Sequence, residues 1–407
     1  MKKFRIIFFI VAIIYVITLG IVTCYRGGKD LKVGLYGVHQ ITQKGSPYDN
    51  PTDPKRPIFR YAPPNAILQR PFLLSSRMTA PFEFDNIMPS VLMWYAAEIL
   101  ALVVSALILF KLIPSPSKNV SWRNLMASFL LASPLIGYEL INCQNKIMAL
   151  AFMLASIYMF RKNRFFLSAL FFNIAIVIYI PLIFFIIYFI FRGGLKFIMQ
   201  FIAAFLLVFI IVPSATIGYT FNNFLLKDYF LRCLKPFFMT TSYATYLDVR
   251  VSSQSLPSAI GRIFVSGPAV NYKYLISAEL IHVIIRVFST SIIILSVLAA
   301  WKRQKVPAEA LQYTLFFLLA FVLPSYCLWY TWAWLFVIYF AVFNYISYPE
   351  VGPAQKKILL ILTLILVLGS YSSAVKQLNI ISVLCWSTLI FWAGITGLLI
   401  RRGYSKI

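Results

Sequence analysis

Residues 4–24 read FRIIFFIVAIIYVITLGIVTC, a run in which Arg5 is the single charged residue. A helix needs about 20 consecutive apolar residues to cross the hydrocarbon core of a bilayer. This run is long enough, and the chain as a whole shares its character, with 61% hydrophobic and 12% charged residues among 407. Such a balance lies far from that of a soluble globular domain. The sequence therefore predicts an integral membrane protein.

Apolar runs of this kind recur from end to end, and the predicted fold class is an all-α polytopic helical bundle of about twelve transmembrane helices, forming a single membrane domain over residues 1–407. Pro181 falls between two short runs and predicts a broken pair that turns back within the membrane. The predicted spans are residues 4–24, 88–112, 124–141, 146–160, 165–179, 180–192, 197–217, 274–301, 308–328, 331–349, 357–374 and 379–400.

Basic residues in short loops predict the orientation, because Lys and Arg in such loops stay on the cytoplasmic side. They precede the first run and then fall in alternate short loops, on one side of a twelve-span count. Both termini are therefore predicted to be cytoplasmic, and the two long loops, residues 25–87 and 218–273, extracytoplasmic. A basic start and an apolar run also fit a cleaved signal peptide. The length of the run and the sequence IVTCYRGG, a poor cleavage site, favour a retained anchor.

The formal net charge is +25, yet much of the excess lies in the predicted cytoplasmic loops, so we do not expect a nucleic-acid partner. The predicted outer loops are also basic on balance, with nine Lys/Arg against five acids in the first and six against two in the second. That excess suits an anionic ligand such as a lipid phosphate. Non-specific attraction to anionic lipid explains any single lysine equally well.

The sequence gives no support for a metal or a cofactor. The five cysteines are scattered without a CxxC pair, and the two histidines, His39 and His282, are far apart. The glycines of RGGKD, residues 26–30, lack the strand-to-helix setting and the closing Lys-Ser/Thr of a P-loop. We therefore expect neither metal chemistry nor ATP hydrolysis.

Asp30 is the acidic residue with the most informative position, just beyond the first predicted span. Partial burial at the membrane interface raises the pKa of a carboxyl, which favours a role as general base. The same residue opens DLKVGLYGVHQI, where Leu31, Leu35 and Val38 follow helical spacing. An N-cap of an interfacial amphipathic helix is therefore an equally good interpretation.

Several motifs, taken in order, resemble one family: KGSPYD at 44–49, FRYAPPNAILQRPF at 59–72, CQNK at 143–146, YIPLIFF at 179–185, SSQSLPSAIGRIF at 252–264 and LPSYCLWYTW at 323–332. Their order and spacing resemble the polytopic glycosyltransferases of family 87. That family includes polyprenyl-phosphate-mannose-dependent mannosyltransferases and related arabinofuranosyltransferases. The most specific element is G-x-P-Y-D followed by F-x-Y-x-P-P. The resemblance implies a GT-C fold, a polyprenyl-phospho-sugar donor and Asp30 as catalytic base.

The chain departs from the family pattern at two places. The family often has a lysine before the proline of the broken span, where this chain has Tyr179 and Ile180 before Pro181. It also tends to show Ser-Trp-x-His-His near the end of the last motif, where this chain has Tyr326, Cys327, Trp329 and Tyr330. Because these residues differ from the family pattern, the resemblance identifies neither the donor sugar nor whether the activity is retained.

The matched motifs supply the predicted substrate-binding residues, which are Tyr48, Asp49, Arg60, Tyr61, Gln144, Asn145, Gln254, Ser255 and Arg262. Arginine offers a planar donor fork to phosphate, and aromatic faces suit the C–H surfaces of sugars. Each motif also has a structural interpretation. The first loop is rich in turn residues, Gln144 and Asn145 are placed to tie two helices together, and Arg262 is placed to snorkel to the interface.

From the resemblance we expect a membrane enzyme that transfers a sugar from a polyprenyl-phosphate carrier to a hydroxyl of an extracytoplasmic glycan, glycolipid or protein. An enzyme outside the cytoplasm has no nucleotide-activated substrates, so a lipid-linked donor fits this placement. The lipid bilayer is then both solvent and source of the donor, and no metal is required in principle. The alternative is a transporter or flippase of lipid-linked sugars, which should show two related halves. The sequence contains no such internal repeat.

Overall fold

The computed structural model of the protein describes residues 2–48, 59, 61–73, 77–80, 83–234, 253–266, 273–301, 304, 308–324, 327, 329–372 and 375–404. It is built from helices, with two short antiparallel ribbons. The chain divides into two compact units. Unit one holds Met1–Ile108, Ile136–Ile180 and Leu195–Pro236, and unit two holds Leu109–Leu135, Pro181–Gly194 and Phe237–Ile407.

Seven helical stretches among the described residues have the length and hydropathy of a membrane span. Three further apolar helices, Phe165–Ile178, Glu309–Val322 and Thr331–Ile346, are shorter. This confirms a helical membrane protein, while the count of twelve and the GT-C fold stay predictions. The seven are α1 (Lys2–Arg26), α4 (Met88–Leu112), α5 (Lys118–Ile141), the stretch Ile180–Ile217, α13 (Ala278–Trp301), α16 (Pro353–Tyr371) and α18 (Val383–Tyr404).

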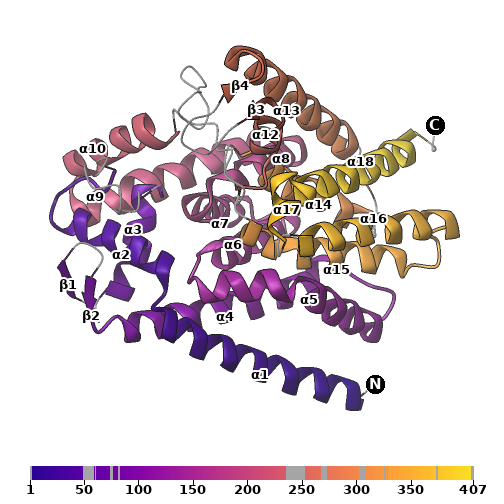
Figure 1. Cartoon of the computed structure of the whole chain (residues 1–407), viewed down its shortest axis with the longest axis horizontal. Helices are drawn as coiled ribbons and strands as arrows, with labels where there is room; N and C mark the ends of the chain where they lie inside the picture. The colour runs from indigo at the N-terminus through magenta and orange to yellow at the C-terminus, as the bar shows by residue number, and fades with distance from the viewer. Residues whose placement is uncertain are drawn as a thin grey trace. The chain divides into compact units, whose positions relative to one another are not determined.

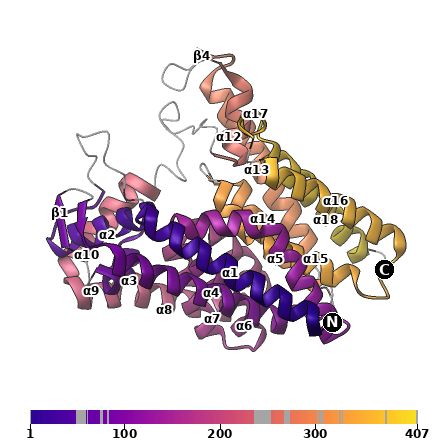
Figure 2. The same ribbon diagram turned by 60° about the horizontal axis from the view of Figure 1, so that its bottom comes forward.

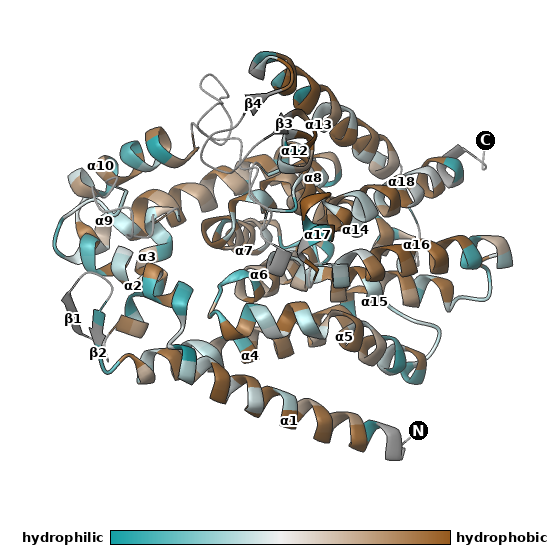
Figure 3. Ribbon diagram, in the orientation of Figure 1, coloured by the Kyte–Doolittle hydropathy of each residue, from teal (hydrophilic) through white to brown (hydrophobic). Residues whose placement is uncertain are grey.

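In unit one, α1 runs alongside α4 (Figure 1). The hydroxyl of Tyr95 on α4 donates a hydrogen bond to the carbonyl oxygen of Val16 at 2.5 Å, and Gly20 of α1 leaves room for the same ring. Most of the remaining surface of α1 is apolar and exposed, as its brown colour in Figure 3 shows. Such a surface is favourable in contact with lipid and unfavourable in contact with water.

Unit one continues with α2 (Lys29–Thr42), α3 (Pro63–Leu73) and a ribbon in which β1 (Arg77–Ala80) pairs with β2 (Glu83–Asp85). After α5 comes a helical hairpin of α6 (Lys146–Arg161) and α7 (Phe165–Ile178). A short loop closes this hairpin, with Asn163 at φ 57°. Inside it, the buried hydroxyl of Ser156 donates to the carbonyl oxygen of Ser168 at 2.8 Å. The hydrogen bond satisfies a polar group that would be costly to leave unpaired in an apolar interior.

The helix break predicted at Pro181 is confirmed. Tyr179 is extended, with φ −145° and ψ 96°, and Pro181 lies in the 3-10 helix η1 (Ile180–Phe184). Proline has no N–H for a helical hydrogen bond, so the α-helix cannot continue through it. A second break, at Gly194 with φ 59°, interrupts α8 (Phe185–Phe205). It falls between the predicted spans 180–192 and 197–217. That the broken pair turns back within the membrane stays a prediction.

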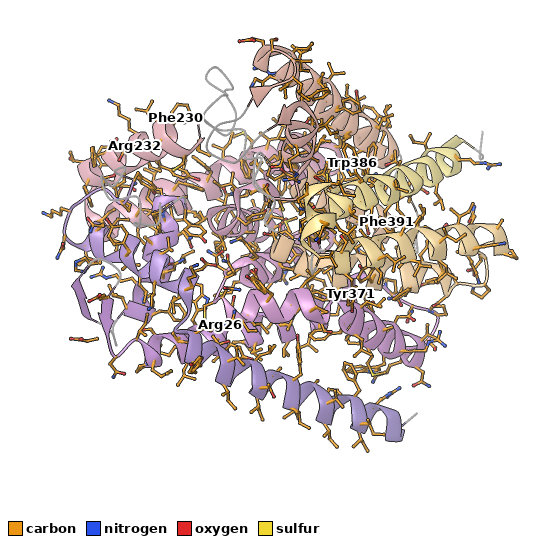
Figure 4. The ribbon with its side chains drawn as sticks, in the orientation of Figure 1. Arg26, Phe230, Arg232, Tyr371, Trp386 and Phe391 are labelled. Atoms are coloured by element: carbon orange, nitrogen blue, oxygen red, sulfur yellow. The ribbon has the colours of Figure 1, made fainter. Side chains whose placement is uncertain are left out.

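Beyond α8, the π-helix η2 (Leu206–Ile211) and α9 (Val212–Ile217) complete the span, and Gly218, at φ 92°, separates it from α10 (Tyr219–Tyr229) and the π-helix η3 (Phe230–Leu234). The inner face of α10 packs with α2 and the first-loop aromatics through Leu225 and Tyr229. Its outer face exposes Phe224, and the adjoining η3 exposes Phe230 and Leu231. Figure 4 labels Phe230 together with Arg232. Because α10 begins directly after a span, this amphipathic segment is expected to lie at the membrane surface.

Unit two contains α12 (Leu256–Phe264), the ribbon of β3 (Val265–Ser266) and β4 (Lys273–Tyr274), α14 (Glu309–Val322), the 3-10 helix η5 (Trp329–Trp334), α15 (Leu335–Ile346) and α17 (Lys376–Ile380). Helices α16 and α18 lie side by side (Figure 2), where Gly369 faces Ser387 and Gly394 faces Leu362. Small residues at such contacts let helix backbones approach closely. At the centre, α14 is buried on all sides.

Candidate active site

Asp30 lies directly after the turn between the first span and α2. Gly27 and Gly28 adopt left-handed backbone, with φ 67° and 55°, and α2 begins at Lys29. Glycine adopts this conformation without the penalty that a side chain brings. A Cβ at Gly28 would lie 3.1 Å from Val91 and 3.2 Å from the sulfur of Cys143, so the turn also fits tightly against α4 and the turn that follows α5. The chain therefore places Asp30 in the first turn of α2.

The interpretation of Asp30 as the N-cap of α2 is wrong, because the N-cap lies two residues earlier. Gly28 occupies the N-cap, and no side chain makes a capping hydrogen bond there. The predicted apolar face of the helix is confirmed, because Leu31, Leu35 and Val38 are all buried. Asp30 is free of the capping role and sits where a carboxylate is favoured by the positive end of the helix dipole.

The turn between α5 and α6 lies beside Asp30. The backbone N–H of Asp30 donates to the carbonyl oxygen of Asn142 at 3.2 Å. Cys143, with φ 51°, bends the chain sharply, and two residues of the predicted site, Gln144 and Asn145, follow it at 3% exposure each. The structure therefore brings Asp30, Gln144 and Asn145 to one end of unit one.

Lys146 is the centre of the polar contacts in this turn. Its ammonium nitrogen donates to Oε1 of Gln144 at 2.9 Å and to Oδ1 of Asn145 at 3.1 Å. Its backbone N–H donates to Oε1 of Glu139 at 2.9 Å. Glu139 is fully buried and Lys146 is 7% exposed. The ammonium charge is tolerated at this depth because it is hydrogen-bonded and is attracted by the negative charges of Glu139 and Asp30.

Two tyrosine rings enclose the same ammonium group. The nitrogen of Lys146 lies 5.5 Å from the centre of the Tyr61 ring and 5.7 Å from that of Tyr179. Both distances are within the range of a cation–π attraction. Tyr61, predicted to bind substrate, thus joins Asp30, Gln144 and Asn145. Burial raises the pKa of its hydroxyl, and the nearby Lys146 ammonium opposes that rise.

Asp30 is partly buried, and its charge is set by this environment. Burial raises the pKa of its carboxyl above the ordinary value of 3.8, while the positive charges of Lys146 and Lys29 pull the pKa down. Burial is the largest of these effects. A carboxylate with a raised pKa accepts a proton more readily than an ordinary aspartate does. The arrangement is therefore suited to general base chemistry.

Tyr48, the other first-loop tyrosine of the predicted site, is buried at 3% exposure. Its hydroxyl donates to the carbonyl oxygen of Tyr61 at 2.8 Å, and its ring lies 5.7 Å from that of Phe59 and 5.6 Å from that of Tyr229. These contacts favour a packing role that fixes the backbone of Tyr61. Contact of Tyr48 with a sugar stays a prediction. Asp49 and Arg60, the remaining first-loop residues of the predicted site, lie outside the described residues.

The first loop is also tied to α10 and η3. The hydroxyl of Ser46 donates a short hydrogen bond to the carboxylate of Asp228. Arg232 pairs with the same carboxylate at 2.5 Å and donates to the carbonyl oxygen of Tyr48 at 3.2 Å. The first predicted outer loop and the beginning of the second, both in unit one, are therefore joined at the residues that precede Asp49.

Gln254, Ser255 and Arg262 belong to unit two and are described with it. Arg262 donates to Oγ of Ser382 from Nε at 3.1 Å and from Nη2 at 2.5 Å, and Nη2 also reaches the carbonyl oxygen of Ser253 at 2.8 Å. The side-chain nitrogen of Gln254 donates to the carbonyl oxygen of Asn379 at 3.1 Å. Ser255 donates to Ser258 at 3.0 Å. These contacts favour a structural tie between α12 and the turn before α18, and the predicted phosphate contact of Arg262 stays a prediction.

Lys146 and Glu139 complete the site, and neither was among the predicted binding or catalytic residues. The available signal was Lys146 itself, a basic residue at the predicted outer end of an apolar run, where positive charge is not needed for orientation. Within the part of the chain that the structure describes, no group of three or more His, Cys, Asp or Glu side chains is placed to hold a metal ion.

Comparison with known proteins found no match among curated proteins or solved structures. The model of glycosyltransferase family 87 matches residues 59–325, which is more than half of the 407 residues. The matched region includes Tyr61, Gln144, Asn145 and Lys146, and it begins after Asp30. The chain belongs to glycosyltransferase family 87.

Proposed function

We propose that this member of glycosyltransferase family 87 transfers a sugar, a mannose-like hexose or a pentose, from a polyprenyl-phosphate carrier to an extracytoplasmic glycan, glycolipid or protein. Family membership makes the protein a glycosyltransferase, and its apolar helices make it a multi-pass membrane protein. The lipid carrier, the acceptor and the side of the membrane are parts of the proposal.

The observation that carries the proposal is the position of Asp30. Asp30 lies four residues after Arg26, the last residue of the first span, and its partly buried carboxylate interacts electrostatically with Lys146 and Tyr61. A donor whose lipid lies in the bilayer presents its phosphate and sugar at the membrane surface, which is where this carboxylate is expected. A base at this depth is within reach of both the acceptor hydroxyl and the lipid-linked sugar.

The proposed reaction is a direct displacement at the anomeric carbon. The acceptor hydroxyl oxygen forms a bond to that carbon while the bond between the carbon and the phosphate oxygen breaks, and its electron pair leaves with the polyprenyl phosphate. Asp30 takes the proton of the acceptor hydroxyl. Basic side chains of the outer loops stabilise the negative charge of the departing phosphate. A single displacement inverts the configuration at the anomeric carbon, so donor and product should have opposite anomeric configurations.

The proposed orientation places both termini in the cytoplasm and Asp30 outside. With the native cysteines replaced, cysteine at the exposed position of Lys44 should react with an impermeant thiol reagent in intact cells, and cysteine at Asn163 should not. Residue 163 is the matched control because it lies in a short loop that the basic residues assign to the cytoplasm. Labelling at residue 163 with none at residue 44 would reverse the proposed orientation.

A transporter or flippase of lipid-linked sugars is the competing function. Deleting the gene and analysing surface glycans together with lipid-linked intermediates distinguishes the two. A transferase predicts loss of one sugar from a surface acceptor while its polyprenyl-phospho-sugar accumulates, accessible from the outer face. A flippase predicts the same donor confined to the inner face. Unchanged surface glycans and unchanged lipid intermediates would contradict both.

A further inference from the structure

We propose that Lys146 is a positioning residue for Asp30: its buried ammonium group, fixed by Gln144, Asn145 and Tyr61, holds a positive charge beside the carboxylate. The inference rests on the proposed role of Asp30 as the base and extends it to a residue in the matched part of the chain. Lys146 acts through Asp30 in this proposal and does not touch the reacting atoms.

The hydrogen bonds of Lys146 explain why it does not serve as a substrate ligand. A lysine ammonium has three N–H donors. Two are used by the amide oxygens of Gln144 and Asn145, at 2.9 and 3.1 Å, and the nitrogen also lies 5.5 Å from the centre of the Tyr61 ring. At 7% exposure the group has little surface left for a donor phosphate. The electrostatic effect of its positive charge, in contrast, extends beyond its hydrogen bonds, because little water is present at this buried position to screen the charge.

The backbone holds this charge at a constant position relative to Asp30. The N–H of Asp30 is hydrogen-bonded to Asn142, and the N–H of Lys146 is hydrogen-bonded to the buried carboxylate of Glu139. Both anchors belong to the end of α5 and the turn that follows it. These bonds fix the backbone of both residues, and the hydrogen bonds to Gln144 and Asn145 hold the ammonium group on the same turn.

Several other charged or titratable groups act on Asp30, and the effect of Lys146 has to be judged against them. Lys29 on α2 adds positive charge. Tyr61, Glu139 and Cys143 also couple to Asp30, and each opposes ionisation of the carboxylate when it is itself ionised. Lys146 has a larger effect on the Asp30 carboxylate than Lys29 does, and its fixed partners distinguish it from Lys29, which is exposed on the first turn of α2.

Removing the charge of Lys146 should therefore make Asp30 harder to ionise. Burial already raises the pKa of Asp30, and loss of the opposing Lys146 charge lets the pKa rise further. The acidic limb of the pH–rate profile should move to higher pH, while the rate well above that limb is largely kept. A purely structural role would lower the rate at all pH values and leave the limb in place.

The test is an infrared titration of the purified protein in lipid nanodiscs, which needs no sugar donor. The protonated-carboxyl band of Asp30 is identified as the band lost in Asp30→Asn. In Lys146→Met, which keeps the length of the side chain, the midpoint of that band should move to higher pH. In Lys146→Arg, which keeps the charge, it should stay close to that of the unchanged protein. Lys146→Gln, which removes the charge but keeps a polar end for Gln144 and Asn145, serves if Lys146→Met does not fold, and it should shift the midpoint in the same direction.

An unchanged midpoint in Lys146→Met or in Lys146→Gln would overturn the role of Lys146. That result is separate from failure of the proposed function, which would appear as normal sugar transfer by Asp30→Asn. A shifted midpoint together with active Asp30→Asn would leave Lys146 controlling the ionisation of a carboxylate that is not the base, and so would also overturn a positioning role in catalysis.

Discussion

The backbone N–H of Asp30 donates a hydrogen bond to the carbonyl oxygen of Asn142 at 3.2 Å, although 112 residues separate the two in sequence. This contact joins the end of the first span to the turn that carries Gln144, Asn145 and Lys146. A carboxylate from a segment that precedes the family match is thereby held against residues inside the match. Separate experiments can test the turn before α2, the ionisation of Asp30 and the contacts of Arg262 and α10.

The tight turn before α2 predicts that Gly28→Ala destabilises the protein. A non-glycine residue in left-handed backbone costs about 1–2 kcal/mol, and the new Cβ would also press on Val91 and Cys143. Gly352→Ala is the matched control, because Gly352 has φ −62° and nothing within 4 Å of its Cβ position. Thermal unfolding in detergent should show a lower midpoint for Gly28→Ala alone. Equal midpoints for the two variants would argue against the strained turn.

Asp30 should also influence stability, with a sign fixed by its raised pKa. Because the folded-state pKa lies above the ordinary 3.8, the folded state binds the proton more tightly than the unfolded state. Stability from this group is fully present below pH 3.8 and is lost as the pH rises through the folded-state pKa. Asp30→Asn should therefore be more stable than the unchanged protein at neutral pH, and the difference should vanish in acid. A constant difference at all pH values would contradict a raised pKa.

Arg262 is predicted to contribute to stability through Ser382 and Ser253. Hydrogen bonds to a charged group contribute about 1.5–3 kcal/mol, so Arg262→Ala should lower the free energy of unfolding by an amount of this order. Lys227→Ala removes an exposed basic side chain and is the control. Denaturant unfolding of both variants measures the difference. A fully stable Arg262→Ala protein that fails to use a lipid-linked donor would contradict the structural role and favour contact of Arg262 with the donor phosphate.

The apolar face of α10 and η3 is expected to contact lipid. Spin labels on cysteines replacing Phe224 and Phe230 should be more accessible to oxygen, which partitions into the bilayer, than to a water-soluble nickel chelate. A label at Lys44 is the control, since Lys44 is an exposed charged residue of the first long loop. It should show the opposite preference. Nickel accessibility at Phe224 equal to that at Lys44 would place α10 in water.

Long apolar segments were the part of the fold that the sequence could predict. Residues 88–112 match α4 residue for residue, and Pro181 marks a real break, because lack of an N–H acts locally. Shorter helices were harder to assign as spans. The break at Gly194 also agrees with the sequence, since it lies in the pair Gly193-Gly194, between the predicted spans 180–192 and 197–217.

The candidate site was predictable only in part, for a physical reason. Asp30 was recognisable from its position just beyond the first span and Tyr61 from its motif, but the burial of Lys146 depends on partners from other segments. Glu139 and Tyr61 come from α5 and the first loop, and periodicity within one segment cannot reveal contacts between segments. The same limit applies to Tyr48 and Arg262, whose side chains are engaged by distant parts of their own units.

The central claim is that Asp30 is the base for sugar transfer. The direct measurement compares restoration of the missing surface sugar by Asp30→Asn, Asp30→Glu and the unchanged protein in a strain lacking the gene, at equal protein levels. Asp30→Asn keeps the size of the side chain but cannot accept the proton, so transfer should fall by roughly 100-fold or more. Asp30→Glu keeps a carboxylate and should retain more activity than Asp30→Asn. Transfer by Asp30→Asn close to that of the unchanged protein would contradict the assignment.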